Sequence, residues 1–423
     1  MITTRQELEE ALEKCVRCGR CLANCPIYKI TGREGSSARG KLALLTAELR
    51  GEADLAGRMK DLLSLCLLCG ACNEDCANEV MADELIQAGR TLALKGRGLP
   101  AVKRLLAKDL MSRGALTRAA LSSRSLLLKN VPPESGLHFR FPLPGMDPDR
   151  WLPPLAPQPF LDTHSHSQTH ESSGDGPRVA LFVGCVSNFL RPASAQAAVR
   201  ILEAAGARVI IPPDQVCCGK PASGAGDAKT ALYLARKNLA AFDPAQYDFL
   251  VAFCATCSEQ LKRYPYLEGL EVSESWASRV RDMNELLVKD LDWRPEPGHS
   301  MAEDAPLRVF YHDPCHLRRK QGLFEEPRAL IQSLPGVELV GADQPLVCCG
   351  YGGLFNLWHY PLSQDIFFQR MESITPFEPD AIVTACSGCL LQFEDGIRRL
   401  GLETRILSLV ELMASRGLDK PEA

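Results

Sequence analysis

Residues 15–26, CVRCGRCLANCP, decide the fold, because their four cysteines follow one another as Cys-x-x-Cys-x-x-Cys-x-x-x-Cys. Residues 66–77, CLLCGACNEDCA, repeat these steps, with Ala77 where the first run has Pro26. Three evenly stepped thiolates can hold one face of a cubane iron–sulfur cluster. Zinc sites more often use paired Cys-x-x-Cys units, so zinc is the weaker alternative. The two runs therefore predict 4Fe–4S clusters.

Ligation is expected to cross between the runs, because bacterial ferredoxins use this spacing and the fourth cysteine of each run there binds the other cluster. The first cluster is predicted on Cys15, Cys18, Cys21 and Cys76, and the second on Cys66, Cys69, Cys72 and Cys25. Thr4 and Glu7 have the spacing of a capping box and predict a helix that leads to the first run. We expect residues 1–98 to form a helical, ferredoxin-like dicluster domain.

The other ten of the eighteen cysteines form an internal repeat, with matching positions 130 to 132 residues apart. Each copy has one cysteine, then Cys-Cys-Gly, then Cys-x-x-Cys. Adjacent thiols form strained disulfides, but both can reach one polynuclear iron centre. We expect Gly219 and Gly350 to let the backbone approach that centre. The first set is Cys185, Cys217, Cys218, Cys254 and Cys257, and the second is Cys315, Cys348, Cys349, Cys386 and Cys389.

Short apolar runs precede the cysteines in both copies and alternate with helical stretches, which predicts parallel α/β units. The cysteines follow the strand ends, where open parallel sheets bind their ligands. The fold class is therefore α+β and multidomain: the helical dicluster domain is followed by two repeated α/β Cys-Cys-Gly domains, at residues 178–296 and 305–423. The predicted strands lie within 179–185, 209–211, 249–254, 307–315, 337–340 and 381–386, and the predicted helices within 194–205, 229–242 and 327–333.

The connecting region has two parts of different composition. Residues 91–140 carry 10 basic and 2 acidic side chains. We interpret residues 99–130 as a basic helical segment packed on the cluster domain; the alternative is a docking surface for an acidic partner or a membrane face. Residues 131–177 are rich in Pro, Ser, Gly and His and predict an extended linker. A metal site at His164, His166 and His170 is the less common use of such residues.

Several classes of protein are disfavoured. The net charge of −4 argues against a nucleic-acid binder. The absence of a long apolar run or a secretory signal predicts a cytoplasmic protein, with peripheral contact at the inner membrane face as the alternative. In a reducing compartment the cysteines are expected to bind metal rather than form disulfides. Residues 35–41 resemble a P-loop, but Leu42 replaces its hydroxyl residue. No dinucleotide fingerprint follows a strand, so electrons are expected to enter from another protein.

With these motifs the chain resembles the iron–sulfur subunit of glycolate oxidase and the related D-lactate dehydrogenase subunits. The same modules occur in heterodisulfide reductase. The resemblance covers nearly the whole chain outside the linker. It implies that each five-cysteine set can bind a non-cubane 4Fe–4S cluster, which adds one or two such clusters to the two cubanes. It also implies an FAD-containing dehydrogenase subunit as partner, and a quinone or another electron acceptor.

Two functions follow. In the first, the chain is the electron-transfer subunit of a glycolate or D-lactate dehydrogenase, an oxidoreductase complex whose flavoprotein oxidises the hydroxy acid. In the alternative, it is a heterodisulfide-reductase-like subunit that reduces a disulfide at a non-cubane cluster. His316 and His312 are the acid–base candidates for the alternative, although we expect them to hydrogen-bond the backbone near the cluster. A zinc site or a redox dithiol in one copy is the competing interpretation of the repeat.

Overall fold

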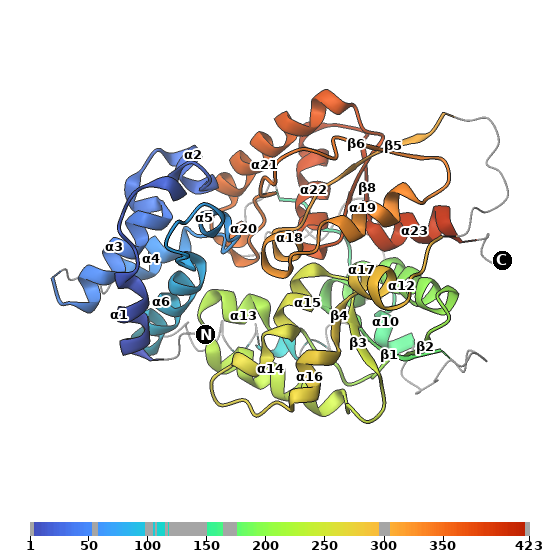
Figure 1. Ribbon diagram of the computed structural model, residues 1–423, viewed down its shortest axis with the longest axis horizontal. Coiled ribbons are helices and arrows are strands. Elements are labelled where there is room, and N and C mark those ends of the chain that lie inside the picture. The colour runs from blue at the N-terminus through green and yellow to red at the C-terminus, as the bar shows by residue number, and fades with distance from the viewer. Residues whose placement is uncertain are drawn as a thin grey trace.

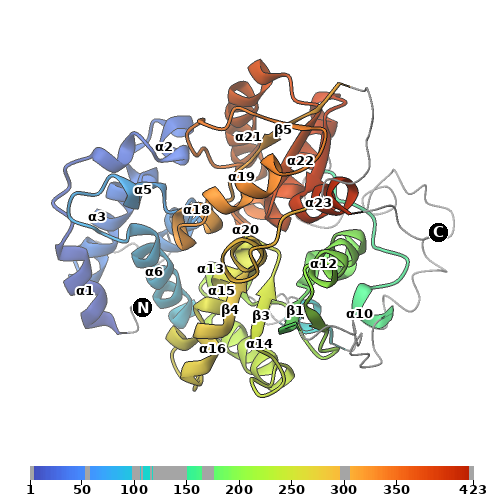
Figure 2. The same cartoon turned by 45° about the vertical axis from the view of Figure 1, so that its right-hand side comes forward.

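The computed structural model describes residues 4–52, 58–97, 105, 108–114, 117, 150–163, 176–295 and 305–418. An N-terminal helical unit lies beside two α/β units, one above the other in Figure 1. The view in Figure 2 shows the same arrangement, with both α/β units in contact with the helical unit. The predicted multidomain fold class is confirmed, while the domain boundaries remain predictions.

The buried core of the helical unit consists mostly of leucines. The predicted capping box is confirmed, since Thr4 and Glu7 hydrogen-bond each other's backbone N–H at the start of α1. Leu8 and Leu12 of α1 are buried against α3 and α6. The helices are α1 (Arg5–Glu13), α2 (Pro26–Thr31), α3 (Ala38–Leu49), α4 (Met59–Ser64), α5 (Ala71–Glu74) and α6 (Ala82–Arg97), with 3₁₀ turns at Arg20–Leu22 and Glu34–Ser36.

The first α/β unit contains a four-stranded, fully parallel sheet in the order β2-β1-β3-β4. Its strands are β1 (Arg178–Phe182), β2 (Arg208–Ile210), β3 (Phe249–Ala252) and β4 (Val280–Asp282). Its helices are α11 (Cys185–Phe189), α12 (Pro192–Ala204), α13 (Lys220–Ala225), α14 (Ala228–Ala241), α15 (Ala255–Lys262), α16 (Glu274–Arg279) and α17 (Met283–Glu285), with a 3₁₀ turn at Tyr264–Tyr266 after α15 and a π turn at Leu286–Asp290 after α17.

The second α/β unit repeats this topology in the order β6-β5-β7-β8. Its strands are β5 (Leu307–Tyr311), β6 (Val337–Val340), β7 (Ala381–Thr384) and β8 (Arg405–Ser408). Its helices are α18 (Cys315–Gln321), α19 (Glu325–Gln332), α20 (Leu354–Trp358), α21 (Tyr360–Ile374), α22 (Ser387–Leu400) and α23 (Leu409–Gly417), with a 3₁₀ turn at Thr375–Phe377. The edge strands β4 and β8 had no cysteine marker, and the sequence analysis missed them.

The two α/β units share one continuous hydrophobic core. Helix α12 packs against α23, and α15 packs against α18 and α22. At the centre of this contact the N–H of Ala255 donates to the carbonyl of Ala385 at 2.9 Å. Because each cysteine set lies at the carboxyl ends of its parallel strands, this packing brings the two sets toward each other.

The region between the cluster domain and the α/β units differs from expectation. Where it is described, the basic segment packs on the first Cys-Cys-Gly unit rather than on the cluster domain: the N–H of Cys217 donates to the carbonyl of Met111 at 3.0 Å. Arg113 also donates to the carbonyl of Pro213 at 2.7 Å. The prediction was wrong because helical periodicity shows which face is buried and not what buries it.

Part of the predicted linker also packs on the two α/β units instead of extending freely between them. The N–H of Trp151 donates to Asp395 of the second unit at 2.7 Å, and the N–H of Ala156 donates to the carbonyl of Phe189 of the first unit at 2.7 Å. Helix α10 (Phe160–Thr163) buries its first two residues on the first unit. The three linker histidines lie outside the described residues. In the described ranges, no helix is both long and apolar enough to cross a bilayer.

Candidate iron–sulfur centres

The second ferredoxin-type set comes together in one cavity. Its walls carry Cys25 together with Cys66, Cys69 and Cys72, and apolar side chains such as Ile27 and Leu67. Cys25 therefore faces the triplet of the other run, as crossed ligation requires. Burial raises the pKa of the Cys66 and Cys72 thiols. A bound cation would favour their thiolates, because metal binding releases thiol protons.

The first ferredoxin-type set lies at the surface, where Cys18 is exposed. The end of the second run is tied to the start of the first, because the amide of Asn78 donates to the carbonyl of Lys14 at 2.9 Å. A hydrogen bond between Asn24 and Asp75 joins the two runs near their fourth cysteines. Both contacts place Cys76 beside the first triplet, so the structure supports the crossed assignment for this cluster as well. Ligation itself remains a prediction.

Two buried cations accompany the second cavity, and the sequence analysis did not assign them a role. Lys41, 1% exposed, lines the cavity and donates to the carbonyl of Ser36. Burial lowers its pKa, while the charges of Cys66 and Cys25 oppose that change. This is the lysine of the P-loop-like segment, which follows helix α2 rather than a strand. Arg90 of α6 donates to the carbonyl of Cys66 at 2.5 Å.

The sulfurs of each Cys-Cys-Gly set interact with one another in a continuous series. In the second copy, for example, the Cys349 and Cys389 sulfurs are 3.3 Å apart. Neighbouring thiols hold the pKa of Cys218 and of Cys349 well below the ordinary thiol value. All eighteen thiols are free. In the order of their contacts, the first set is Cys185, Cys217, Cys218, Cys257 and Cys254, and the second is Cys315, Cys348, Cys349, Cys389 and Cys386.

The sulfur-rich sets fit a polynuclear iron centre better than a disulfide, since each brings five soft donors together in a buried site. The structure gives the glycine of the second Cys-Cys-Gly a constraint that was not predicted. Gly350 has φ of +92°, and a Cβ there would lie 2.4 Å from the carbonyl oxygen of Ser363. Packing against α21 therefore requires glycine at this position, and approach of the backbone to a cluster stays a prediction. In the first copy, Asn238 donates to the carbonyl of Cys217 and Tyr264 donates to that of Cys218, which fixes the cysteine pair.

The cysteine sets also contact one another across the units. The sulfur of Cys69 hydrogen-bonds that of Cys348, which joins the second ferredoxin-type set to the second Cys-Cys-Gly set. The sulfur of Cys254 hydrogen-bonds that of Cys386, which joins the two Cys-Cys-Gly sets. The spatial order is therefore ferredoxin-type unit, second copy, first copy. This order differs from the order along the chain.

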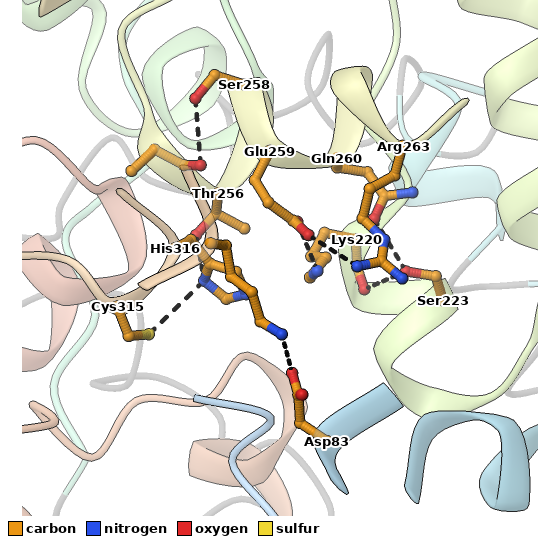
Figure 3. Close-up of polar contacts among 12 residues, drawn as sticks. Asp83, Lys220, Ser223, Thr256, Ser258, Glu259, Gln260, Arg263, Cys315 and His316 are labelled. Carbon is orange, nitrogen blue, oxygen red and sulfur yellow. Dashed lines mark hydrogen bonds and ion pairs between the residues drawn. The ribbon is translucent and has the colours of Figure 1, made fainter. Parts of the chain in front are cut away.

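Ion pairs connect the three units at this junction, and Figure 3 shows the polar group around Glu259 and Asp83. Lys220 pairs with Glu259 at 2.6 Å within the first Cys-Cys-Gly unit. Arg263 pairs with Glu84 of α6 at 2.8 Å. Burial alone would raise the pKa of Glu259, but the charges of Lys220, His316 and Arg263 lower it to about 2. Lys320 of the second unit pairs with Asp83 of α6. Acidic side chains of α6 thus bind both α/β units.

The imidazole of His316 lies between the two Cys-Cys-Gly sets. Its Nδ1 is 3.8 Å from the sulfur of Cys315 and 3.3 Å from the hydroxyl oxygen of Thr256. Burial disfavours the charged ring, but the charges of Cys315 and Glu259 outweigh it and raise the pKa of His316. The expected backbone hydrogen bond is wrong for this side chain, whose contacts are with other side chains.

The comparisons with known proteins agree with this architecture. A family model described as a 4Fe–4S dicluster domain matches residues 11–80, and one described as a cysteine-rich domain matches residues 179–262 and 309–394. A probable glycolate oxidase iron–sulfur subunit of Bacillus subtilis is 30% identical over 425 residues, which cover 96% of this chain and 94% of that relative. The chain belongs to the glycolate oxidase iron–sulfur subunit family.

Other relatives of the chain carry different names. Lactate utilization protein A of Geobacillus thermodenitrificans is 30% identical over 245 residues, which cover 57% of this chain and all of that relative. A subunit of the CoM/CoB fumarate reductase of Methanothermobacter marburgensis is 27% identical over 413 residues, which cover 95% of this chain and 72% of that protein. The recognised family and the iron–sulfur character of the chain are confirmed, whereas the number and type of clusters remain predictions.

Proposed function

We propose that this chain is the electron-transfer subunit of a flavin-linked dehydrogenase that oxidises a 2-hydroxy acid, glycolate or D-lactate. A separate FAD-containing subunit oxidises the substrate, and the clusters carry single electrons to a quinone or another acceptor. Clusters suit this role because a reduced flavin must release its two electrons one at a time to one-electron centres. The names of the glycolate oxidase and lactate utilization relatives support this assignment.

The observation that carries the proposal is the series of cysteine contacts that joins the second ferredoxin-type set to both Cys-Cys-Gly sets. We infer that electrons enter from the flavoprotein at the first ferredoxin-type cluster, since Cys18 is exposed. From there the proposed route passes the second ferredoxin-type cluster, crosses the contact between Cys69 and Cys348, and reaches the second Cys-Cys-Gly centre. The contact between Cys386 and Cys254 then leads to the first centre. We expect two cubane and two non-cubane 4Fe–4S clusters along this route.

The experiment combines anaerobic purification with reconstitution. Iron and acid-labile sulfide should match the four clusters. The isolated chain should not oxidise glycolate or D-lactate. With the cognate flavoprotein, either substrate should bleach the cluster absorption and drive reduction of a dye or a quinone.

Two variants locate the route. Cys348→Ser should block transfer beyond the ferredoxin-type clusters while flavin reduction by the substrate continues. Cys185→Ser, at the far end of the first set, is the matched control and should leave reduction of the second centre intact. If the lone chain reduces disulfides rapidly and the reconstituted pair ignores hydroxy acids, the proposal is wrong and the reductase function replaces it.

A further inference from the structure

The two Cys-Cys-Gly centres share their cysteine pattern but have different neighbours. Strand register defines which residues correspond, because β1 pairs with β3 as β5 pairs with β7, which makes Val179 equivalent to Val309. Three residues later, Phe182 of the first copy occupies the position of His312 in the second. A hydrocarbon ring beside one centre is therefore an imidazole, with two ring nitrogens, beside the other.

The imidazole of His312 faces the second centre. The side chain is 1% exposed, and one ring nitrogen lies with the sulfurs of Cys349 and Cys389 in a group whose members are all within 4.8 Å of one another. Its Nδ1 has no hydrogen-bond partner among the described residues. The imidazole packs edge-on against the ring of Phe393, with the two ring centroids 4.9 Å apart.

A second difference adds positive charge beside the same centre. A Cβ on Gly219 would contact the carbonyl oxygen of Ala231, and one on Gly350 would contact that of Ser363, so these helix positions correspond. Seven residues later, Asn238 of the first copy is replaced by Arg370 in the second. Arg370 is 2% exposed. Burial lowers its pKa to about 10, so the guanidinium remains a cation near neutral pH, and the charges of Asp313 and then of the cysteine pair favour that cation.

We propose that His312 and Arg370 make the second Cys-Cys-Gly centre the more easily reduced of the two, with His312 donating an N–H hydrogen bond to the Cys349 thiolate. This rests on the proposed function, since it requires a cluster in each centre. Hydrogen bonds to cluster sulfurs and nearby positive charge stabilise the reduced, more negative cluster and raise its reduction potential. An electron that arrives through Cys69 then settles on the second centre before the first is reduced.

An anaerobic redox titration of the full chain, followed by electron paramagnetic resonance, tests this inference. Cys218→Ser removes the first centre, so the remaining non-cubane signal belongs to the second. In that background His312→Phe installs the residue of the first copy. At a fixed potential it should lower the ratio of reduced to oxidised cluster about tenfold, which is a shift of about 59 mV for one electron. Arg370→Asn should also lower this ratio. His312→Gln keeps an N–H donor, so its ratio of reduced to oxidised cluster should stay close to that of the chain with His312.

Iron and sulfide analysis of each sample separates the outcomes. If the second centre is loaded but its potential is unchanged in both His312→Phe and Arg370→Asn, this inference is overturned and the proposed function stands. If the wild-type chain holds no cluster in either Cys-Cys-Gly centre, both are overturned. A strong hyperfine coupling from a histidine nitrogen bonded directly to iron overturns the hydrogen-bond assignment. Should His312→Phe fail to assemble, the glutamine and Arg370→Asn variants decide the question.

Discussion

Replacing Arg90 by methionine should weaken the joint between the ferredoxin-type unit and the first Cys-Cys-Gly unit. Arg90 is 9% exposed, and its guanidinium donates to the carbonyls of Leu63 at 2.7 Å, Cys66 at 2.5 Å and Gly224 at 2.5 Å. Leu63 lies in the last turn of α4, where carbonyls lack partners within the helix. Cys66 is a predicted cluster ligand, and Gly224 belongs to α13. One side chain therefore caps a helix, holds a ligand loop and joins two units.

The magnitude follows from these contacts. Three carbonyls, one buried and two partly buried, lose their donor. Each such loss costs about 1–1.5 kcal/mol net, since methionine also avoids the cost of burying a cation. The free energy of unfolding should therefore fall by about 3–5 kcal/mol. For a unit of this size, 1 kcal/mol corresponds to about 2–4 °C. The first thermal transition should fall by roughly 10 °C, and the loosened Cys66 loop should release the second cluster sooner.

Thermal unfolding followed by circular dichroism, together with the rate of cluster bleaching in air, measures both effects. Arg90→Lys keeps the charge but reaches fewer carbonyls, so its loss should be intermediate. Arg50→Met is the surface control, because Arg50 is about half exposed and its single pair with Glu13 spans 3.3 Å; it should cost less than about 0.5 kcal/mol. A fall of less than about 2 °C in Arg90→Met, with normal cluster retention, would refute the reasoning.

Three further predictions concern single side chains. Cys25→Ser should remove the signal of the cluster held by the Cys66–Cys72 triplet and spare the other cubane, whereas loss of the Cys15–Cys21 cluster would contradict crossed ligation. Lys41→Met should lower the reduction potential of the second cubane by roughly 100 mV, which is the effect of losing one positive charge about 6 Å from the cluster in an effective dielectric of about 20. In the same redox titration, Lys29→Met should leave that potential unchanged, because Lys29 is exposed. Burial raises the pKa of Asp282 to about 6, above the value of about 3.9 in an unfolded chain. The stability contributed by its proton is therefore present below about pH 4 and lost as the pH rises through about 6. In urea titrations, the free energy of unfolding of Asp282→Asn should rise relative to that of the wild type between about pH 4 and 7, by at most about 3 kcal/mol. A difference between the two proteins that does not change with pH would contradict this.

The sequence predicted the fold well where one local signal was sufficient. The capping box at Thr4 and the apolar runs before Cys254 and Cys386 each identified their element, because backbone capping and strand burial depend on neighbouring residues. Strands β4 and β8 were missed, because short edge strands such as Arg405–Ser408 are only partly buried and carry no marker. The packing partner of the basic segment was wrong for a related reason: amphipathicity does not identify the surface that covers it.

At the centres, sequence alone determined which residues belong together, since thiolate spacing and the repeat of about 130 residues follow directly from the order of the chain. Tertiary structure decided how the centres relate. The contacts of Cys69 with Cys348 and of Cys254 with Cys386 depend on how separate sheets and helices pack, and no short-range pattern encodes that packing. The offset of the repeat already pairs His312 with Phe182, and strand register agrees with that pairing; only the tertiary structure shows that a His312 ring nitrogen lies beside the sulfurs of Cys349 and Cys389. The spacing of cysteines along the chain determines which donors can share a cluster. The packing of residues that are distant in sequence sets the burial and charge around each cluster, and these determine which cluster an electron reaches and how strongly it is held.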